Sequence, residues 1–294
     1  MRIAVFGNIY KKKVSLEPVQ VLFEALKDKQ AHIITDHRFF DFLREEVPDA
    51  AEMISEIIDD DSNDFSADIA LSVGGDGTFL STAMRVGNKQ IPILGINAGR
   101  LGFLADVSCN EIEDAINEIY SNNYIIEQRS LIQLKTDNPD FCDYPHALNE
   151  IAILKQDSSS MIAIDVRING EYMNTYQADG LLIATPTGST AYSMSVGGPV
   201  VAPQANSLIL SPVASHSLNV RPLIIPDTWT AELGVRSRSK NFLVSLDGRS
   251  TVFEHEYKIV ITKSDFKIRV IKRPQHTFFN TLKNKLMWGA DKRS

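Results

Sequence analysis

The chain has 294 residues, of which 44% are hydrophobic and 23% charged, and its formal net charge is −7 at pH 7. This balance is typical of a globular protein and excludes a chain that is disordered throughout, while the acidic charge argues against a protein that binds nucleic acid. The two cysteines, Cys109 and Cys142, cannot form a disulfide framework and lack the CxxC spacing of a zinc site, which favours free thiols in a reducing cytosol.

Membrane association is not indicated by the sequence. The opening stretch MRIAVFGN becomes polar too soon for a signal peptide. No window approaches the roughly 18 apolar residues that a transmembrane helix needs. We therefore expect a cytoplasmic protein without membrane contact, long enough for two domains.

Strand-like and helix-like segments alternate up to about residue 125. Short apolar runs predict strands at 2–7, 31–35, 68–73 and 91–96, and helical spacing predicts helices over 15–29, 78–86 and 110–120. In the first helix we expect Ser15 as the N-cap and Pro18 in the first turn. This alternation predicts a parallel sheet with helices on both sides. The acidic stretch 59–64 is interpreted as a solvated loop rather than a metal site.

The pattern changes at about residue 129 to short alternating segments rich in β-branched residues. They are punctuated by Asn169-Gly170, Asp179-Gly180 and Asp247-Gly248, which are typical turn signals. We predict an antiparallel, β-rich second domain. Apolar residues at helical spacing in the tail predict a helix that packs back on the first domain. The predicted boundaries are 1–128, 129–271 and 272–294.

The stretch LSVGGDGTFL at 71–80 places three glycines around Asp76. We expect a strand to end at Val73 and a helix to begin near Thr78, so that this turn lies at the carboxyl end of a parallel strand, where ligands collect. The glycines permit positive φ and let backbone N–H groups approach phosphate oxygens, beside a helix N-terminus. Because the spacing is neither GxGxxG nor GxxxxGK[ST], a purely structural turn stays an alternative.

Two further polar interruptions follow apolar strands. Asn97, Gly99 and Gly102 belong to a second glycine turn, which either serves the same ligand or is an unrelated tight turn. Asn149 and Glu150 interrupt a strand. An amide can pair with a base edge and a carboxylate can accept from both hydroxyls of a ribose, although a simple strand terminus is the alternative.

The richest stretch is 177–201, where a turn is crowded with hydroxyl groups. These belong to Thr185, Thr187, Ser189, Thr190, Tyr192, Ser193 and Ser195. A polyhydroxylated ligand with phosphates would use such donors, and a serine hydrolase is disfavoured because no GxSxG motif is present. His216 lies in a turn beside further hydroxyls, whereas the six histidines show no metal-binding spacing. Lys11–Lys13 either reach a nucleotide phosphate or form a solvated loop.

In this order the motifs resemble the NAD kinase family. They are GGDG at 74–77, NAGRLGFL at 97–104, NE at 149–150, DG at 179–180, TPTGSTAYSMSVGGP at 185–199 and SHSLNVRP at 215–222. The resemblance implies an N-terminal α/β domain and a C-terminal β-rich domain with the dinucleotide between them. It also implies Mg²⁺-dependent transfer of the ATP γ-phosphoryl group to the 2′-hydroxyl of the adenosine ribose of NAD, giving NADP, in a homodimer or homotetramer.

The same resemblance implies a role for individual residues. Asp76 would be the catalytic proton acceptor. Asn149 and Thr190 would hold the adenine, and Glu150 the ribose. The remaining dinucleotide contacts fall on Gly77, Asp179, Ala191, Tyr192, Ser193, Met194 and Ser195. The phosphoryl donor would meet Gly74, Gly75 and Gly77, with His216 as a further phosphate-binding candidate. No side chain is expected as a metal ligand, because phosphates would hold most of the Mg²⁺ coordination.

Two positions depart from the family pattern, and two rival functions stay open. Arg249 stands where family members commonly have glutamine, and Gln177 where bacterial members have arginine, so we expect effects on the periphery of the NAD site. We also expect the neutral glycine turn to leave Asp76 without a neighbouring cation. The rivals are a lipid or diacylglycerol kinase, which shares GGDGT but needs an apolar pocket, and a non-catalytic NAD(P)-binding sensor, which needs no base.

Overall fold

The computed structural model describes residues 1–9, 15–59, 64–99, 101–139, 141, 143–156 and 160–289. Lys11–Lys13, most of the acidic stretch and Cys142 lie outside these ranges. The chain divides into two compact units, one of residues 1–128 with 268–294 and the other of residues 129–267. Each has its own hydrophobic core. None of the helices in the described part of the chain combines the length and apolar character that crossing a bilayer requires.

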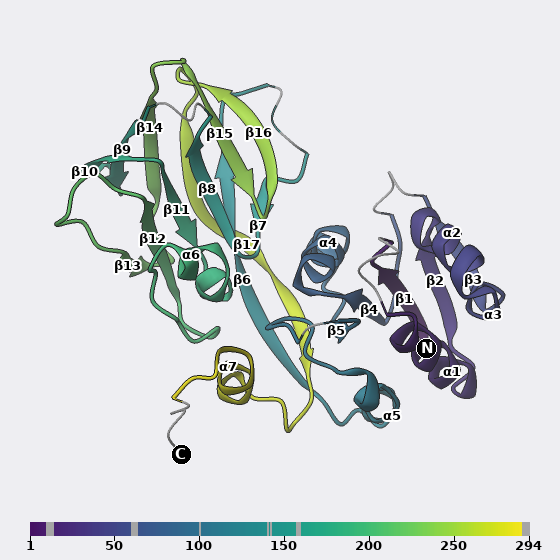
Figure 1. Ribbon diagram of the computed structural model, residues 1–294. Coiled ribbons are helices and arrows are strands. Elements are labelled where there is room, and N and C mark those ends of the chain that lie inside the picture. The colour runs from purple at the N-terminus through teal and green to yellow at the C-terminus, as the bar shows by residue number, and fades with distance from the viewer. Residues whose placement is uncertain are drawn as a thin grey trace. The chain divides into compact units, whose positions relative to one another are not determined.

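The first unit contains a parallel sheet in the order β5-β4-β1-β2-β3 (Figure 1). Its strands are β1 (Arg2–Gly7), β2 (His32–Asp36), β3 (Ile54–Ile58), β4 (Ile69–Gly74) and β5 (Ile93–Asn97). The four strands predicted in this region are confirmed to within two residues at each end. β3 was missed, because the exposed Ser55 and Glu56 interrupt its apolar pattern.

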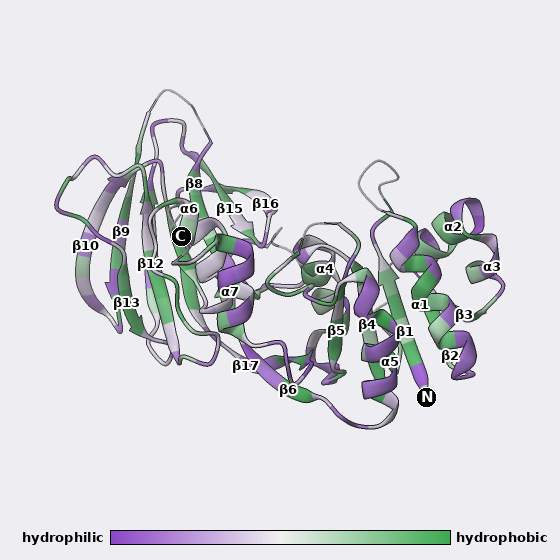
Figure 2. Ribbon diagram, turned by 60° about the horizontal axis from the view of Figure 1, so that its bottom comes forward, coloured by the Kyte–Doolittle hydropathy of each residue, from purple (hydrophilic) through white to green (hydrophobic). Residues whose placement is uncertain are grey.

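Helices cover both faces of this sheet, as predicted. They are α1 (Glu17–Asp28), α2 (His37–Glu46), α3 (Pro48–Ala51), α4 (Asp76–Val86) and α5 (Ile112–Tyr120). Val5 of β1 belongs to one apolar cluster with residues of α1 and α5. The next residue, Phe6, points to the other face, where its ring lies 5.2 Å from the guanidinium of Arg85 on α4. Figure 2 shows β1 as mainly hydrophobic and α5 as largely hydrophilic on its visible side.

Several helix ends differ from the predicted ones. Ser15 is not an N-cap, because α1 begins at Glu17 after Leu16 and has no side-chain cap. Helix α4 begins at Asp76, two residues before the predicted start, since the Phe79 N–H already donates to the Gly75 carbonyl at 3.1 Å. Helix α2 was not predicted; it begins directly after β2 and is capped by the Asp36 carboxylate.

The second unit is built from antiparallel sheets, as predicted. One contains β9 (Ile162–Ile168), β10 (Glu171–Ala178), β14 (Ala231–Arg236) and part of β17 (Ile259–Lys272), and β6 (Ile125–Lys135) and β7 (His146–Ala147) join it. The other contains β8 (Glu150–Lys155), β11 (Gly180–Ala184), β12 (Ser207–Val213), β13 (Leu223–Pro226), β15 (Asn241–Leu246) and β16 (Arg249–Glu254). Their facing apolar side chains form the core.

Two of the three predicted turns are hairpins. Asn169 and Gly170 have φ values of 51° and 82°, and Asp247 and Gly248 have 48° and 85°, which is the positive-φ pair of a type I′ turn. Asp179-Gly180 is different, because it joins β10 of one sheet to β11 of the other. There the Asp179 N–H donates to the Val213 carbonyl at 2.9 Å.

The C-terminal segment returns to the first unit. Residues 268–271, which the sequence analysis assigned to the β-rich domain, belong to the first unit because Val270 pairs in parallel with Ile93 of β5. Helix α7 (Phe278–Leu286) follows, capped by the Thr277 hydroxyl. Ahead of it, the buried Lys272 ammonium lies 2.6 Å from an Asp106 carboxylate oxygen and anchors the tail.

Candidate active site

The first candidate site lies where the strand order of the parallel sheet reverses. From β1 the chain continues to β2 and β3 on one side of the sheet, whereas from β4 it continues to β5 on the other side. Ligands of open α/β sheets bind at the carboxyl ends of the strands at such a point. A cavity of about 560 Å³ is found there. Its lining includes Gly7, Asn8, Arg38, Gly75, Gly77 and Arg85.

The glycines of the turn have two different roles. A Cβ on Gly74 would lie 2.3 Å from the Thr78 hydroxyl oxygen, so Gly74 is required by packing. At Gly75 and Gly77 an added Cβ would meet nothing within 4 Å, and neither has a positive φ. The positive φ that glycine permits is therefore not used at these two positions. They instead leave open space in the cavity at the N-terminus of α4.

Asp76, the first residue of α4, has its carboxylate surrounded by donors. Oδ1 accepts from the N–H groups of Leu104 (2.9 Å) and Ala105 (3.0 Å). Oδ2 accepts from the N–H of Phe103 (3.0 Å) and from Lys285 Nζ (3.2 Å). Burial by itself raises the pKa of Asp76, but the three backbone N–H groups and the Lys285 ammonium together lower it below its ordinary value. Asp76 is an anion at neutral pH.

The second glycine turn positions this carboxylate. A Cβ on Gly102 would lie 2.0 Å from Asp76 Oδ1, so only glycine fits there. Asn97 is buried and its Oδ1 accepts from the Gly99 N–H at 2.6 Å, which shapes the turn. The two glycine turns are thus parts of one arrangement, and the alternative of unrelated tight turns is wrong. The expected absence of a cation near Asp76 is wrong too, because α7 brings Lys285 to it.

A second cluster lies in the second unit, at the start of β8. The Asp247 carboxylate accepts from the N–H groups of Leu148 (2.7 Å), Asn149 (2.8 Å) and Glu150 (3.1 Å). The Asp247 N–H in turn donates to the Glu150 carbonyl at 3.1 Å. The tip of the β15–β16 hairpin therefore holds the backbone of Asn149 and Glu150. In the sequence, Asp247-Gly248 shows only a turn signal, and this positioning role was not predicted.

Glu150 is the unusual group of this cluster. Its Oε2 is buried and has no hydrogen-bond partner among the described residues. Burial, followed by the negative charge of Asp247, raises the pKa of Glu150 to about 8. A buried carboxyl oxygen without a donor is costly. The arrangement fits a ligand that brings hydroxyl donors to this oxygen.

The hydroxyl-rich loop is in part structural. Thr185, Ser189 and Ser193 are fully buried. Their hydroxyls bond to the Leu148 carbonyl, the Pro186 carbonyl and the Ser211 hydroxyl respectively. The expectation that this whole set of hydroxyls serves a ligand is therefore corrected, and for Ser193 the side chain is already used inside the fold.

The loop packs on the backbone of Asn149 through Gly188. A Cβ on Gly188 would be 2.1 Å from the Asn149 carbonyl oxygen, so the loop packs directly on that backbone. After the 3₁₀ turn Thr187–Thr190 comes the short helix α6 (Tyr192–Ser195). Thr190, Ala191 and Met194 are half-buried, whereas Tyr192 and Ser195 are exposed. The loop that carries Thr190 thus packs, in the second unit, on the segment that carries Asn149 and Glu150.

Three further residues singled out from the sequence, namely Asp179, His216 and Arg249, have contacts of their own. The Asp179 carboxylate pairs with the Lys155 ammonium at 2.7 Å. His216 lies on the exposed loop after β12, and its backbone N–H donates to the Gln177 carbonyl at 2.9 Å. The Arg249 guanidinium donates to the carbonyls of Tyr144 (3.0 Å) and His146 (2.6 Å). Arg249 thus fixes the backbone that leads into the Asn149 segment.

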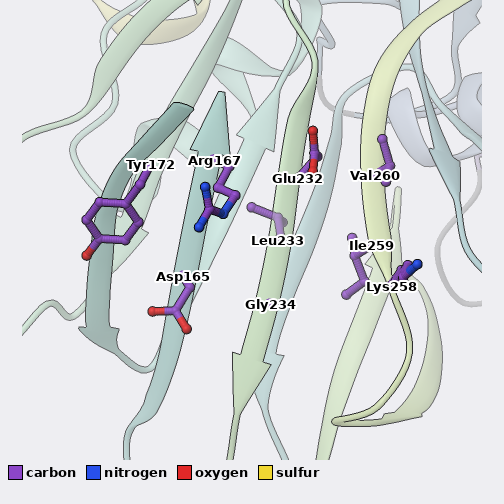
Figure 3. Close-up of a pocket in the computed structure, with 9 residues that line it drawn as sticks. All are labelled: Asp165, Arg167, Tyr172, Glu232, Leu233, Gly234, Lys258, Ile259 and Val260. Carbon is purple, nitrogen blue, oxygen red and sulfur yellow. The ribbon is translucent and has the colours of Figure 1, made fainter. Parts of the chain in front are cut away.

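A further cavity, of about 540 Å³, lies on the strands β9, β10, β14 and β17 of the second unit (Figure 3). Its lining carries both charges, with Asp165 and Arg167 on β9 and Glu232 on β14. Asp165 pairs with Arg236 at 2.9 Å, and Arg167 donates to the Gly170 carbonyl. None of the site residues predicted from the sequence lines this cavity.

Comparison with known proteins assigns the family. Residues 4–124 match the family model described as the ATP-NAD kinase N-terminal domain, and residues 148–273 match the ATP-NAD kinase C-terminal domain. The chain belongs to the NAD kinase family. It is therefore a phosphotransferase with NAD kinase function, and the matches over both domains set aside the lipid-kinase and sensor alternatives.

Curated NAD kinases are similar to this chain along its whole length. The NAD kinase of Bacteroides fragilis is 52% identical over 295 residues, covering 100% of both chains. That of Flavobacterium psychrophilum is 44% identical, again over 100% of both. That of Porphyromonas gingivalis is 40% identical over 98% of both.

Solved structures of NAD kinase family members share the fold. Yeast NADH kinase complexed with NADH has a TM-score of 0.85 at 22% identity, covering 99% of this chain and 89% of that one. An NAD kinase from Archaeoglobus fulgidus in complex with ATP has a TM-score of 0.76 at 27% identity, covering 98% and 99%. The two-domain NAD kinase fold expected from the sequence is confirmed.

Proposed function

We propose that the chain transfers the γ-phosphoryl group of ATP to the 2′-hydroxyl of the adenosine ribose of NAD, with Asp76 as the proton acceptor. The observation that carries this proposal is the Asp76 carboxylate, fixed as an anion at the N-terminus of α4, beside an open cavity bordered by Gly75 and Gly77. A sugar hydroxyl is a weak nucleophile. A carboxylate that takes its proton contributes about 10²–10⁴-fold to the rate.

The proposed donor site is the cavity at the ends of β1 and β4. Gly75 and Gly77 leave room for phosphate oxygens next to the N-terminus of α4, whose partial positive charge favours anions. The guanidinium groups of Arg38 and Arg85 line the same cavity and would neutralise phosphate charge. The related Archaeoglobus fulgidus enzyme was solved in complex with ATP, which supports ATP as the donor.

The proposed acceptor site is the Glu150 cluster. The unpartnered Glu150 Oε2 would accept from ribose hydroxyls, while the Asn149 side chain and Thr190 would hold the adenine. Asp179 and residues 191–195 would contact the rest of the dinucleotide. Of these, Ser193 would contribute through its backbone, because its hydroxyl bonds to Ser211.

Mg²⁺ fits this donor site as a phosphate-bound ion. Mg²⁺ is usually held by one or two carboxylates together with substrate phosphates. Asp36 lines the cavity, with Oδ1 capping α2 and Oδ2 3.8 Å from Arg85. Within the described ranges no group of three or more acidic, histidine or cysteine side chains could hold a metal. Bound Mg²⁺ would neutralise the phosphate oxygens of the donor.

The donor site is tested by Arg38→Ala. Since a charge-assisted hydrogen bond to phosphate is lost, we expect the KM for ATP to rise about 10-fold or more, with the KM for NAD unchanged. Arg44→Ala is the matched control, because Arg44 also lies on α2 but pairs with Asp41 on the surface. Initial rates are measured as NADP formed from NAD, Mg²⁺ and varied ATP. If both variants have the same KM for ATP, the donor site is not in this cavity.

The open space at Gly77 gives a second prediction. Gly77→Ala puts a methyl group into the cavity without touching protein atoms, and alanine is the better helix former by up to about 1 kcal/mol. We expect unchanged or higher thermal stability and a KM for ATP raised about 10-fold, because the methyl displaces a phosphate oxygen. Gly74→Ala, which clashes with Thr78, should instead lower the melting temperature. An unchanged KM for ATP in Gly77→Ala contradicts the proposed donor site.

We further propose a homodimer or homotetramer in the cytoplasm. In the second unit, Tyr172, Leu223, Ile224 and Trp229 expose between 40% and 54% of their surface. Three of them line a cavity of about 460 Å³ with Ile168 and Met173. Such exposed apolar residues support burial against another subunit. Light scattering of the purified chain measures the subunit number.

A further inference from the structure

The Asp76 carboxylate has no acceptor position to spare. A carboxylate offers about four lone-pair sites, and the N–H groups of Phe103, Leu104 and Ala105 together with the Lys285 ammonium supply four donors. A sugar hydroxyl that gives its proton to Asp76 has to form a hydrogen bond with it first. One of the four donors must therefore give way when the acceptor binds.

Lys285 is the donor that can move. The three N–H groups belong to the backbone of one turn, in which Leu104 and Ala105 are buried. The Lys285 side chain is flexible and 31% exposed, and its ammonium lies 4.7 Å from the centre of the Phe103 ring. This cation–π contact keeps the ammonium near Asp76 even when the direct hydrogen bond is broken.

We propose that Lys285 passes its hydrogen bond from Asp76 to the phosphoryl group that is being transferred, and then holds the 2′-phosphate of the product. The phosphoryl group arrives at the same sugar oxygen that displaces the ammonium from Asp76, so the new anion forms within reach of Lys285. In the step, the sugar oxygen bonds to the γ-phosphorus, the bond from that phosphorus to the β–γ bridging oxygen breaks, and the hydroxyl proton goes to Asp76. Lys285 donates hydrogen bonds and takes no part in the proton transfer.

Several contacts of the segment ahead of α7 fix the position of the helix that carries Lys285. Arg273 bonds to Glu118 at 2.7 Å, and His276 Nε2 lies 2.8 Å from a Glu111 carboxylate oxygen. Together with the Lys272–Asp106 pair, these contacts anchor the segment ahead of α7. Leu282, one turn before Lys285, is buried. The contacts ahead of α7 and the burial of Leu282 hold the start and middle of the helix, and Lys285 on its last turn reaches Asp76.

This inference rests on the proposed role of Asp76, and its test is the affinity for product relative to substrate. In Lys285→Met we expect the affinity for NADP to fall about 10- to 100-fold, the loss of one charge-assisted hydrogen bond to phosphate, while the affinity for NAD changes less than about 3-fold. The turnover number should fall by a similar factor. Isothermal titration calorimetry of the full chain with NADP and with NAD measures the ratio. Lys285→Arg keeps the positive charge and should keep most of the affinity for NADP.

The control is Lys283→Met, which removes an exposed lysine from the same helix and should leave both affinities unchanged. An unchanged NADP-to-NAD ratio in Lys285→Met overturns the inference, as does an equal loss in Lys283→Met. If Lys285→Met does not fold, Lys285→Gln gives the same two outcomes. Normal turnover of Asp76→Asn would show instead that Asp76 is not the base. Failure of the proposed role of Asp76 can therefore be told apart from failure of the inference about Lys285.

Discussion

Asp76→Asn should lower the turnover number about 10²–10⁴-fold while NAD still binds. The carboxamide oxygen can still accept from the N–H groups of Leu104 and Ala105, so the turn is expected to survive. The amide nitrogen cannot accept a proton from the sugar hydroxyl. It is also a hydrogen-bond donor placed against two other donors, the Phe103 N–H and the Lys285 ammonium. We therefore also expect a destabilisation of about 1–3 kcal/mol.

Turnover, NAD affinity and melting temperature separate these effects. Asp165→Asn is the control, since Asp165 is a partly exposed carboxylate in the cavity of Figure 3, and its loss should change turnover by less than about 2-fold. Near-normal turnover of Asp76→Asn, at a temperature where the variant is folded, would remove Asp76 as the base.

Glu150→Gln should make the protein more stable at high pH and less able to bind NAD. The pKa of Glu150 is raised from its ordinary value of 4.5 to about 8 by burial and by the negative charge of Asp247. Between these pH values the folded state binds more protons than the unfolded state, so the free energy of unfolding of the native chain falls as pH rises. Glutamine does not titrate. The variant should gain on the order of a few kcal/mol at pH 9 relative to the native chain, and nothing at pH 4.

The functional half of this prediction concerns the ribose. Glutamine has a single carbonyl acceptor in place of the two oxygens of the carboxyl group, so we expect the KM for NAD to rise about 10-fold or more. Urea unfolding at both pH values and steady-state kinetics at saturating ATP provide the measurements. Glu171→Gln, an exposed carboxyl at the start of β10, serves as control. If the free energy of unfolding and the KM for NAD of Glu150→Gln both match those of the native chain, Glu150 has only a structural role at the start of the strand.

A gain in stability together with a loss of binding has a physical reason. An unpartnered buried carboxyl is a cost that a purely structural residue would not retain, whereas ligand donors can offset it during binding. Asp247 differs, because three backbone N–H groups already satisfy it. The structure thus separates Asp247, which positions the backbone, from Glu150, whose buried Oε2 has no partner among the described residues, although the sequence shows the first only as part of a turn and the second only as a polar interruption of a strand.

Local signals were read correctly where a few neighbouring residues decide the outcome. Buried runs such as Ile69–Gly74 form strands, and Asn169-Gly170 turns a hairpin because both residues take positive φ. The same reasoning failed at 37–46, where α2 is capped by the preceding strand's last residue, Asp36. It also failed for the hydroxyl-rich loop, since burial of Ser189 and Ser193 is not visible in a list of hydroxyl groups.

By itself the sequence determined the alternation of elements, the glycine turn around Asp76 and the family, because these depend on residues within a few positions of one another. Tertiary structure alone decided what each carboxylate contacts. Asp76 meets Phe103 across 27 positions and Lys285 across 209, and Glu150 meets Asp247 across 97. Such contacts depend on strand order and on how the chain end packs, and no local pattern encodes the distance between residues so far apart.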